Sequence, residues 1–148
     1  MKFDPEVNPI LDAIAAKEDP DSTREYAFEK ALEFYKKNKF FEAHEIFEFQ
    51  WKKEFGVQKL YLQALIQISV SMNKVFVNVN LVGAESQAKL AREKLLKVLN
   101  SPISKEATEY IKNILESLDE WIDWIQKKES LNSKKPEIIS LEKILVLI

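Results

Sequence analysis

The single histidine of the chain, His44, stands among residues whose types and spacing suit acid–base chemistry. Glu45 follows it directly, and Glu48 comes four residues later. On a helix, residues four apart share a face, so the Glu48 carboxylate can hydrogen-bond to the His44 ring. A carboxylate partner orients an imidazole and raises its basicity, as a general base in a hydrolase or an isomerase requires.

The same segment has the form HExxE, which resembles the zinc peptidase motif HExxH. Zinc peptidases need a second imidazole one turn after the first, and Glu48 occupies that position here. A hard ion such as Mg²⁺ or Mn²⁺ can use carboxylates, but Glu42, Glu45 and Glu48 spread around the helix and cannot all converge on one ion. A di-iron site in a helical bundle needs two Glu-x-x-His pairs. We therefore expect no metal and no cofactor.

A second set of polar residues recurs at helical spacing on the next predicted helix, residues 57–78. It consists of Gln63, Gln67, Ser71, Lys74 and Asn78. Facing His44 and Glu48, this stripe would complete a polar pocket between two helices; facing water, it would be the solvated edge of a buried helix, which is the commoner arrangement. The sequence leaves both open. The candidate site residues are Glu42, His44, Glu45, Glu48, Trp51, Gln67, Lys74 and Asn80.

Each candidate also has a purely structural interpretation. His44 suits a boundary histidine that is satisfied by Glu48 or by a backbone carbonyl. Aromatic residues at helical spacing usually fill the interior of a small helical domain. A helical wheel places Phe40, Ala43, Phe47, Trp51 and Phe55 on one apolar arc that includes His44. We expect this arc to face the core, with Glu42 and Glu45 on more polar parts of the helix.

Prolines and capping residues divide the chain into helices that must position these groups. Asn8 and Pro9 begin the first, a Ser22–Glu25 capping box begins the second, Gly56 ends the third, and Asn80 caps the fifth. The predicted helices span residues 9–16, 23–38, 39–55, 57–78, 81–99 and 102–128. We predict an all-α fold, a compact multi-helical bundle of six or seven helices in a single domain over residues 1–148.

The last part of the chain changes in composition. Residues 127–136 are polar, which is typical of a linker, whereas residues 137–148 are rich in Ile, Leu and Val. Such an apolar segment would leave a large hydrophobic surface if it stayed in solvent, so we expect it to dock on the bundle. Its composition suits a short helix or a strand, and without a partner strand elsewhere we predict a helix.

Composition excludes several functional classes. The chain of 148 residues has no cysteine for a disulfide, a thiol nucleophile or a cysteine zinc site, and its two glycines leave no phosphate-binding loop. The near balance of 22 basic and 24 acidic residues gives no general attraction to nucleic acid or anionic lipid. We also find no apolar run long enough to span a membrane and no secretion signal, so we expect a cytoplasmic protein.

Two blocks of the sequence resemble a known family. The first is NKFFEAHE at residues 38–45, followed by Glu48 and Trp51; the second comprises residues 62–69 and 80–84. Together they are similar to the small bacterial and archaeal family called domain of unknown function 309, over roughly residues 24–99. Ala64, Asn73 and Lys74 depart from the family pattern. The resemblance implies a compact multi-helical fold and no established activity.

The competing functional interpretation is an interaction module. Residues 27–47 resemble one tetratricopeptide unit, but nothing repeats at 34 residues, so a single helical hairpin inside a larger bundle is favoured. Such a bundle can offer a groove to a protein partner or self-associate into a homo-oligomer through its apolar C-terminal segment. We favour this binding or assembly function over catalysis at His44; the sequence identifies no small-molecule ligand.

Overall fold

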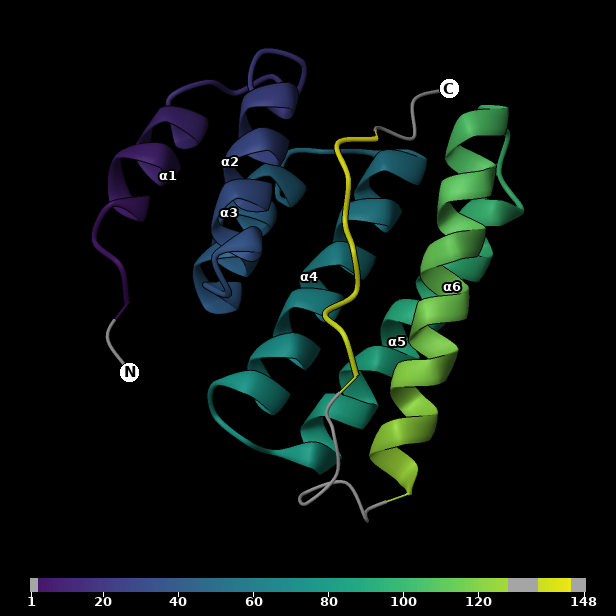
Figure 1. The fold of residues 1–148 in the computed structure, drawn as a ribbon. Helices are drawn as coiled ribbons and strands as arrows, with labels where there is room; N and C mark the ends of the chain where they lie inside the picture. The colour runs from purple at the N-terminus through teal and green to yellow at the C-terminus, as the bar shows by residue number, and fades with distance from the viewer. Residues whose placement is uncertain (1–2, 128–135, 145–148) are drawn as a thin grey trace.

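The computed structural model describes residues 3–127 and 136–144, and within them it confirms the predicted all-α class (Figure 1). The described residues contain six helices and no strand. The helices are α1 (Val7–Ala15), α2 (Arg24–Lys36), α3 (Phe40–Trp51), α4 (Gly56–Phe76), α5 (Leu81–Leu99) and α6 (Lys105–Gln126). None of these helices is both long enough and apolar enough to cross a lipid bilayer.

Helix α4 lies at the centre of the arrangement, with α3 packed on one side and α5 on the other. Helix α1 packs mainly on α3, and α6 packs on α5. The central position follows from the sequence of α4, which is apolar around most of its circumference, because such a helix must be covered on several sides. Its fully buried side chains include Tyr61, Leu65, Ile68 and Met72.

The polar stripe on α4 is not the solvated edge that the commoner arrangement would give. Gln67 and Ser71 are buried, and only Asn78 at the far end is exposed. The Ser71 hydroxyl donates to the carbonyl of Ala84 in α5 at 2.7 Å and accepts from the indole Nε1 of Trp121 in α6 at 2.9 Å. This hydroxyl therefore joins three helices, and α5 and α6 cover the stripe at Ser71, while Gln63 and Lys74 are partly exposed.

The face of α3 that meets the core differs from the predicted arc. Phe40, Ala43 and Phe47 are fully buried as expected, but Phe55 lies beyond the helix and is 77% exposed. Glu42, expected on a polar part of the helix, is instead 2% exposed. The reason is that α3 packs against α1 as well as α2 and α4, so its buried surface is wider than one arc.

Several predicted helix ends shift for identifiable reasons. The Ser22–Glu25 capping box is wrong, because the backbone N–H and hydroxyl of Ser22 both bond to Asp19 and α2 starts two residues later. Helix α2 ends at Lys36 because Asn38, with φ 63°, adopts the left-handed conformation that closes a Schellman-type cap. The predicted cap of α5 is confirmed, since Asn80 Oδ1 accepts from the Gly83 N–H at 3.0 Å.

The first, third and sixth helices also differ at their ends. Helix α1 begins at Val7, so Pro9 lies within its first turn rather than at its first position. Helix α3 ends at Trp51, before the predicted residue 55, and Gly56 with φ 59° turns the chain into α4. Ser104, rather than the region of Pro102, caps α6 by accepting the Ala107 N–H at 3.1 Å.

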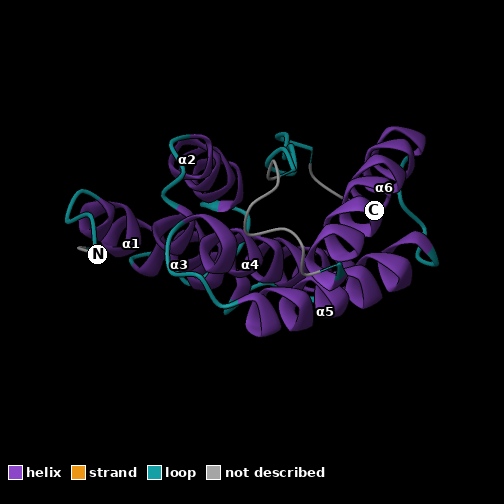
Figure 2. Cartoon of the chain, turned by 60° about the horizontal axis from the view of Figure 1, so that its bottom comes forward, coloured by secondary structure: helices purple, strands orange, loops and turns teal. Residues whose placement is uncertain are grey.

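Residues 136–144, which we call the strap, are not the helix that the sequence predicted. They form an extended segment without regular secondary structure that runs beside α6 in the opposite direction (Figure 1). In Figure 2 the strap lies between α2 and α6, above α4. Ile139 and Leu141 are buried at 3% and 2% exposure, so this part of the C-terminal segment packs on the bundle. Residues 145–148 of the predicted segment lie outside the described part.

Candidate functional site

The structure brings three of the predicted site residues together on the partly exposed side of α3. His44 Nδ1 lies 2.7 Å from the carbonyl oxygen of Phe41, and because that oxygen only accepts, we assign the proton to Nδ1. Nε2 lies 3.5 Å from a carboxylate oxygen of Glu48 and 3.7 Å from one of Glu45. The imidazole is therefore held by its own helix, with its second nitrogen directed at two acidic side chains.

Glu42 belongs to a different contact. One of its oxygens accepts the backbone N–H of Asp4 at 2.9 Å, while the other is buried without a hydrogen-bond partner. Lys39 forms an ion pair with Asp4, and that hydrogen bond lowers the pKa of the Asp4 carboxyl and raises the pKa of Lys39. Glu42 thus ties the segment before α1 to α3, which is a structural use of the carboxylate.

The remaining predicted site residues do not reach His44. Trp51 lies beneath the Lys59 ammonium, 4.6 Å from the ring centroid, and Asn80 caps α5. Lys74 packs its aliphatic chain beside Gly83, and Gln67 is buried in α4 with its amide oxygen unbonded. Within residues 3–127 and 136–144, no hydrogen bond or ion pair links any of these four to His44, and no cluster of acidic and histidine side chains has the form of a metal site.

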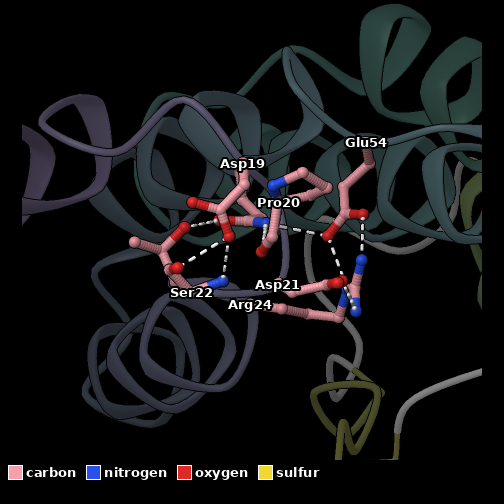
Figure 3. Close-up of polar contacts among 8 residues, drawn as sticks. Asp19, Pro20, Asp21, Ser22, Arg24 and Glu54 are labelled. Carbon is pink, nitrogen blue, oxygen red and sulfur yellow. Dashed lines mark hydrogen bonds and ion pairs between the residues drawn. The ribbon is translucent and has the colours of Figure 1, made fainter.

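A buried polar network at the end of α3 was not predicted from the sequence (Figure 3). The side-chain amide of Gln50 donates to the Pro20 carbonyl at 3.0 Å and to Glu54 at 2.8 Å, and its oxygen accepts from Thr23 at 2.7 Å. Arg24 donates two hydrogen bonds, of 2.7 and 2.8 Å, to the carboxylate of Glu54. We call Thr23, Arg24, Gln50 and Glu54 the Glu54 network. It fixes the loop between α1 and α2 to α3.

The charges of the Glu54 network are matched. The side chain of Glu54 is 1% exposed and that of Arg24 is 17% exposed. The hydrogen bonds that Arg24 donates to Glu54 raise the pKa of its guanidinium, which also pairs with Asp21 at 2.8 Å. Both Glu54 oxygens are engaged by Arg24, so neither is left free to bind a ligand. The network is a structural anchor.

A second group that sequence analysis missed consists of three tyrosines around the strap. Tyr35 of α2 donates its hydroxyl to the carbonyl of Ile139 at 2.6 Å, and Tyr61 of α4 donates to the carbonyl of Ile144 at 3.0 Å. Tyr110 of α6 accepts the backbone N–H of Glu142 at 2.7 Å. Three helices thus each supply one hydroxyl to the backbone of the same extended segment. We call the surface between α2, α4 and α6 that holds the strap the strap groove.

Burial keeps these hydroxyls protonated. It raises the pKa values of Tyr35 and Tyr61 well above the ordinary value of 10.0, and it raises the pKa of Tyr110 to about 12. Desolvation is the main cause in all three cases, because an anionic phenolate would lose its hydration in the groove. The three tyrosines therefore remain hydrogen-bonding hydroxyls across the physiological pH range.

The strap does not fill the strap groove completely. A cavity of about 240 Å³ lies beside it, lined by Tyr35, Lys36 and Asn38 together with strap residues 138–141. A second cavity of about 320 Å³ separates strap residues 136–140 from Ser117, Glu120 and Trp121 at α6. The groove therefore has room for side chains larger than those that the strap presents.

Comparison with protein families supports the resemblance that the sequence indicated. Residues 28–86 match a family described as Domain of unknown function (DUF309). The matched segment runs from α2 to the start of α5, so it includes His44 and two of the groove tyrosines, Tyr35 and Tyr61, but neither α6 nor the strap. Comparison with curated proteins gave no match, and comparison with solved structures gave none either.

No regular spacing in the sequence predicts the strap groove, because its tyrosines are separated by 26 and 49 residues. The available signal is chemical. A tyrosine on a buried helical face must find a hydrogen-bond partner for its hydroxyl, and helix backbones have no spare groups in their interior. A nearby segment without secondary structure supplies such partners, and the apolar C-terminal segment is the one that the sequence marks as a docking element.

Proposed function

We propose that this protein is a binding module that holds an extended chain segment in the strap groove. One observation carries the proposal: three buried hydroxyls, from α2, α4 and α6, hydrogen-bond to backbone atoms of one extended segment. Contacts to backbone atoms do not depend on the identity of the bound side chains. They give a groove general affinity for extended chains, as in other modes of peptide recognition.

Specificity comes from alternate side chains of the bound segment. Ile139 and Leu141 point into the bundle, while Ser140 between them is exposed, which is the period of two expected for an extended chain. A segment with apolar residues two positions apart satisfies this pattern. The ligand class is therefore an extended peptide of the form apolar-x-apolar.

Selection from a library of nonapeptides tests this function. The strap is first released by the double substitution Ile139→Asp and Leu141→Asp, which places two charges at buried positions and leaves the groove residues intact. We expect enrichment of apolar-x-apolar peptides on the released protein. Adding Tyr35→Phe and Tyr110→Phe, which remove two of the backbone contacts, should weaken binding roughly thirtyfold and so reduce the enrichment. A released protein that keeps its helical circular dichroism and enriches no motif would refute the function.

A second candidate function is acid–base catalysis at His44, favoured by the fixed orientation of its ring. The Phe41 carbonyl holds Nδ1, and Glu45 and Glu48 approach Nε2. A fixed acceptor on Nδ1–H, here the Phe41 carbonyl, orients a general base and leaves Nε2 as its basic nitrogen. Thermal melts of the wild type and His44→Gln, with and without Mg²⁺, Mn²⁺ or Zn²⁺, test a metal-dependent form of this site. A midpoint that rises with one ion only in the wild type would support it, because a ligand of the folded state must stabilise that state.

A further inference from the structure

We infer that the strap is a built-in competitor of the strap groove, so that a partner peptide binds only by displacing it. This inference rests on the proposed function and adds its regulation. The strap is the chain's own occupant of the groove, and it already uses the hydroxyls of Tyr35, Tyr61 and Tyr110. A second extended segment cannot bond to the same three groups while the strap is in place.

The connection to α6 makes the strap a strong competitor. Residues 128–135 join Lys127, just after α6, to Pro136 at the start of the strap, and Figure 1 shows α6 ending and the strap beginning in the lower half of the molecule. A link of this length reaches about 30 Å when extended. Short tethers hold a segment at effective concentrations on the order of millimolar. A free peptide at micromolar concentration therefore competes at a disadvantage.

The contacts of the strap are nevertheless few enough for displacement. Its backbone joins no strand ladder, and two of its described side chains, Ile139 and Leu141, are buried, while Ile138 and Ile144 pack on the core only partly buried. Lys143 approaches Glu29 of α2 at 3.7 Å, but both side chains are about half exposed, so water screens their attraction. The cavities beside the strap mean that a larger segment can contact surface that the strap leaves uncovered.

The contacts also define the partner that would displace it. Ile139, Leu141 and Lys143 alternate along the strap, with two apolar positions followed by a basic residue beside Glu29. The favoured partner is an extended segment of another protein with the pattern apolar-x-apolar-x-basic. Its first apolar side chain can be larger than isoleucine, because the cavity lined by Tyr35, Lys36 and Asn38 adjoins that position.

Fluorescence anisotropy with a labelled peptide PEIISLEKI, the sequence of residues 136–144, tests the inference on the full chain. The proteins are the wild type, the released variant Ile139→Asp with Leu141→Asp, and the released variant that also carries Tyr35→Phe and Tyr110→Phe. For a peptide Kd of about 10 μM and an effective strap concentration of about 1 mM, the wild type should bind roughly 100-fold more weakly than the released variant. The variant with two phenylalanines should bind the peptide roughly thirtyfold more weakly than the released variant.

Lengthening the tether gives a second measurement that leaves the strap sequence unchanged. Inserting twenty Gly-Ser residues after Ser133 should strengthen peptide binding by the otherwise wild-type chain roughly fivefold, because effective concentration falls with about the 3/2 power of tether length. The same insertion after Ser101, between α5 and α6, is the matched control and should leave the affinity unchanged.

The outcomes separate the two proposals. Equal, tight binding by the wild type and the released variant would overturn the competition and leave the binding function standing. Both proposals would be overturned if the released variant kept its helical spectrum but bound no peptide and the insertion after Ser133 did not change peptide affinity. A wild-type dimer that dissociates when the peptide binds would also overturn the inference, because the occupant would then be the strap of a second copy.

Discussion

The Glu54 network and the strap groove are both buried polar systems, but they satisfy their hydrogen bonds in different ways. In the network, side chains bond mainly to one another, and both oxygens of Glu54 are engaged by one guanidinium. In the groove, each tyrosine bonds to the backbone of a segment that any extended chain can imitate. The first arrangement specifies its partners residue by residue, whereas the second specifies only an extended backbone. We therefore assign anchoring to the network and exchangeable binding to the groove.

The largest difference between the two regions should follow removal of Glu54. Glu54→Ala leaves the mostly buried Arg24 guanidinium without its main partner, and breaking a buried ion pair in this way costs about 3 to 5 kcal/mol. Urea denaturation measures this loss. Asp119→Ala is the matched control, since Asp119 pairs with Arg92 at the same distance of 2.7 Å at the surface and should cost at most about 1 kcal/mol. Equal losses would show that burial does not distinguish the network.

Alkaline pH should lower the free energy of unfolding, because Tyr110 in the strap groove resists ionisation in the folded state. The pKa of Tyr110 is raised to about 12 in the folded state from an ordinary value of 10.0. Protons therefore stay bound more tightly in the folded than in the unfolded chain, so this stabilisation is complete below pH 10 and is lost as the pH rises from 10 to 12. The rise corresponds to roughly 3 kcal/mol.

The measurement for this prediction is the urea midpoint between pH 9 and 12. Because lysines also titrate in this range, the informative quantity is the difference between the wild type and Tyr110→Phe. We expect the stability of the wild type to fall more steeply with pH. Parallel curves would mean that Tyr110 ionises as easily in the groove as in water.

The loss of stability caused by substitutions on the apolar side of the strap should reach an upper limit, whereas no such limit is expected for the Glu54 network. Ile139→Ala should cost about 2 kcal/mol, at the low end for a buried isoleucine because cavities already adjoin the strap. Once the strap has detached, a further substitution within it costs little more. Ile139→Ala with Leu141→Ala should therefore be less destabilising than the sum of the two single variants, as measured by urea denaturation. Full additivity would argue that the strap unfolds only with the whole bundle.

The parts of this structure that the sequence predicts are those determined by neighbouring residues. The Asn80 cap of α5 was predicted, because a cap is a local feature. The Ser22 capping box failed because Asp19, also close in sequence, captured the same hydroxyl. Local patterns predict that a helix forms, but they do not predict which of two nearby groups a capping side chain will bond to.

The parts that escaped prediction depend on which elements lie opposite one another. Glu42 is buried because the segment before α1 returns to α3, and Gln67 is buried because α4 is central. Neither fact has a signature in the helical wheel. The proximity of His44 and Glu48 follows from spacing alone, whereas the groove tyrosines meet only because the strap passes α2, α4 and α6. A site built from distant helices is therefore invisible until the helices are placed.

The smallest predicted effect concerns a single hydroxyl. Tyr35→Phe keeps the ring in place and removes the 2.6 Å hydrogen bond to the Ile139 carbonyl, which should cost about 1 kcal/mol. The loss should act through the strap and not through α2. In an Ile139→Asp and Leu141→Asp background, where the strap is already released, the same substitution should therefore cost close to nothing. A double-mutant cycle by urea denaturation compares the two costs. A coupling of about 1 kcal/mol would assign the hydroxyl to the groove, whereas an unchanged cost after strap release would make Tyr35 a core residue like those around it.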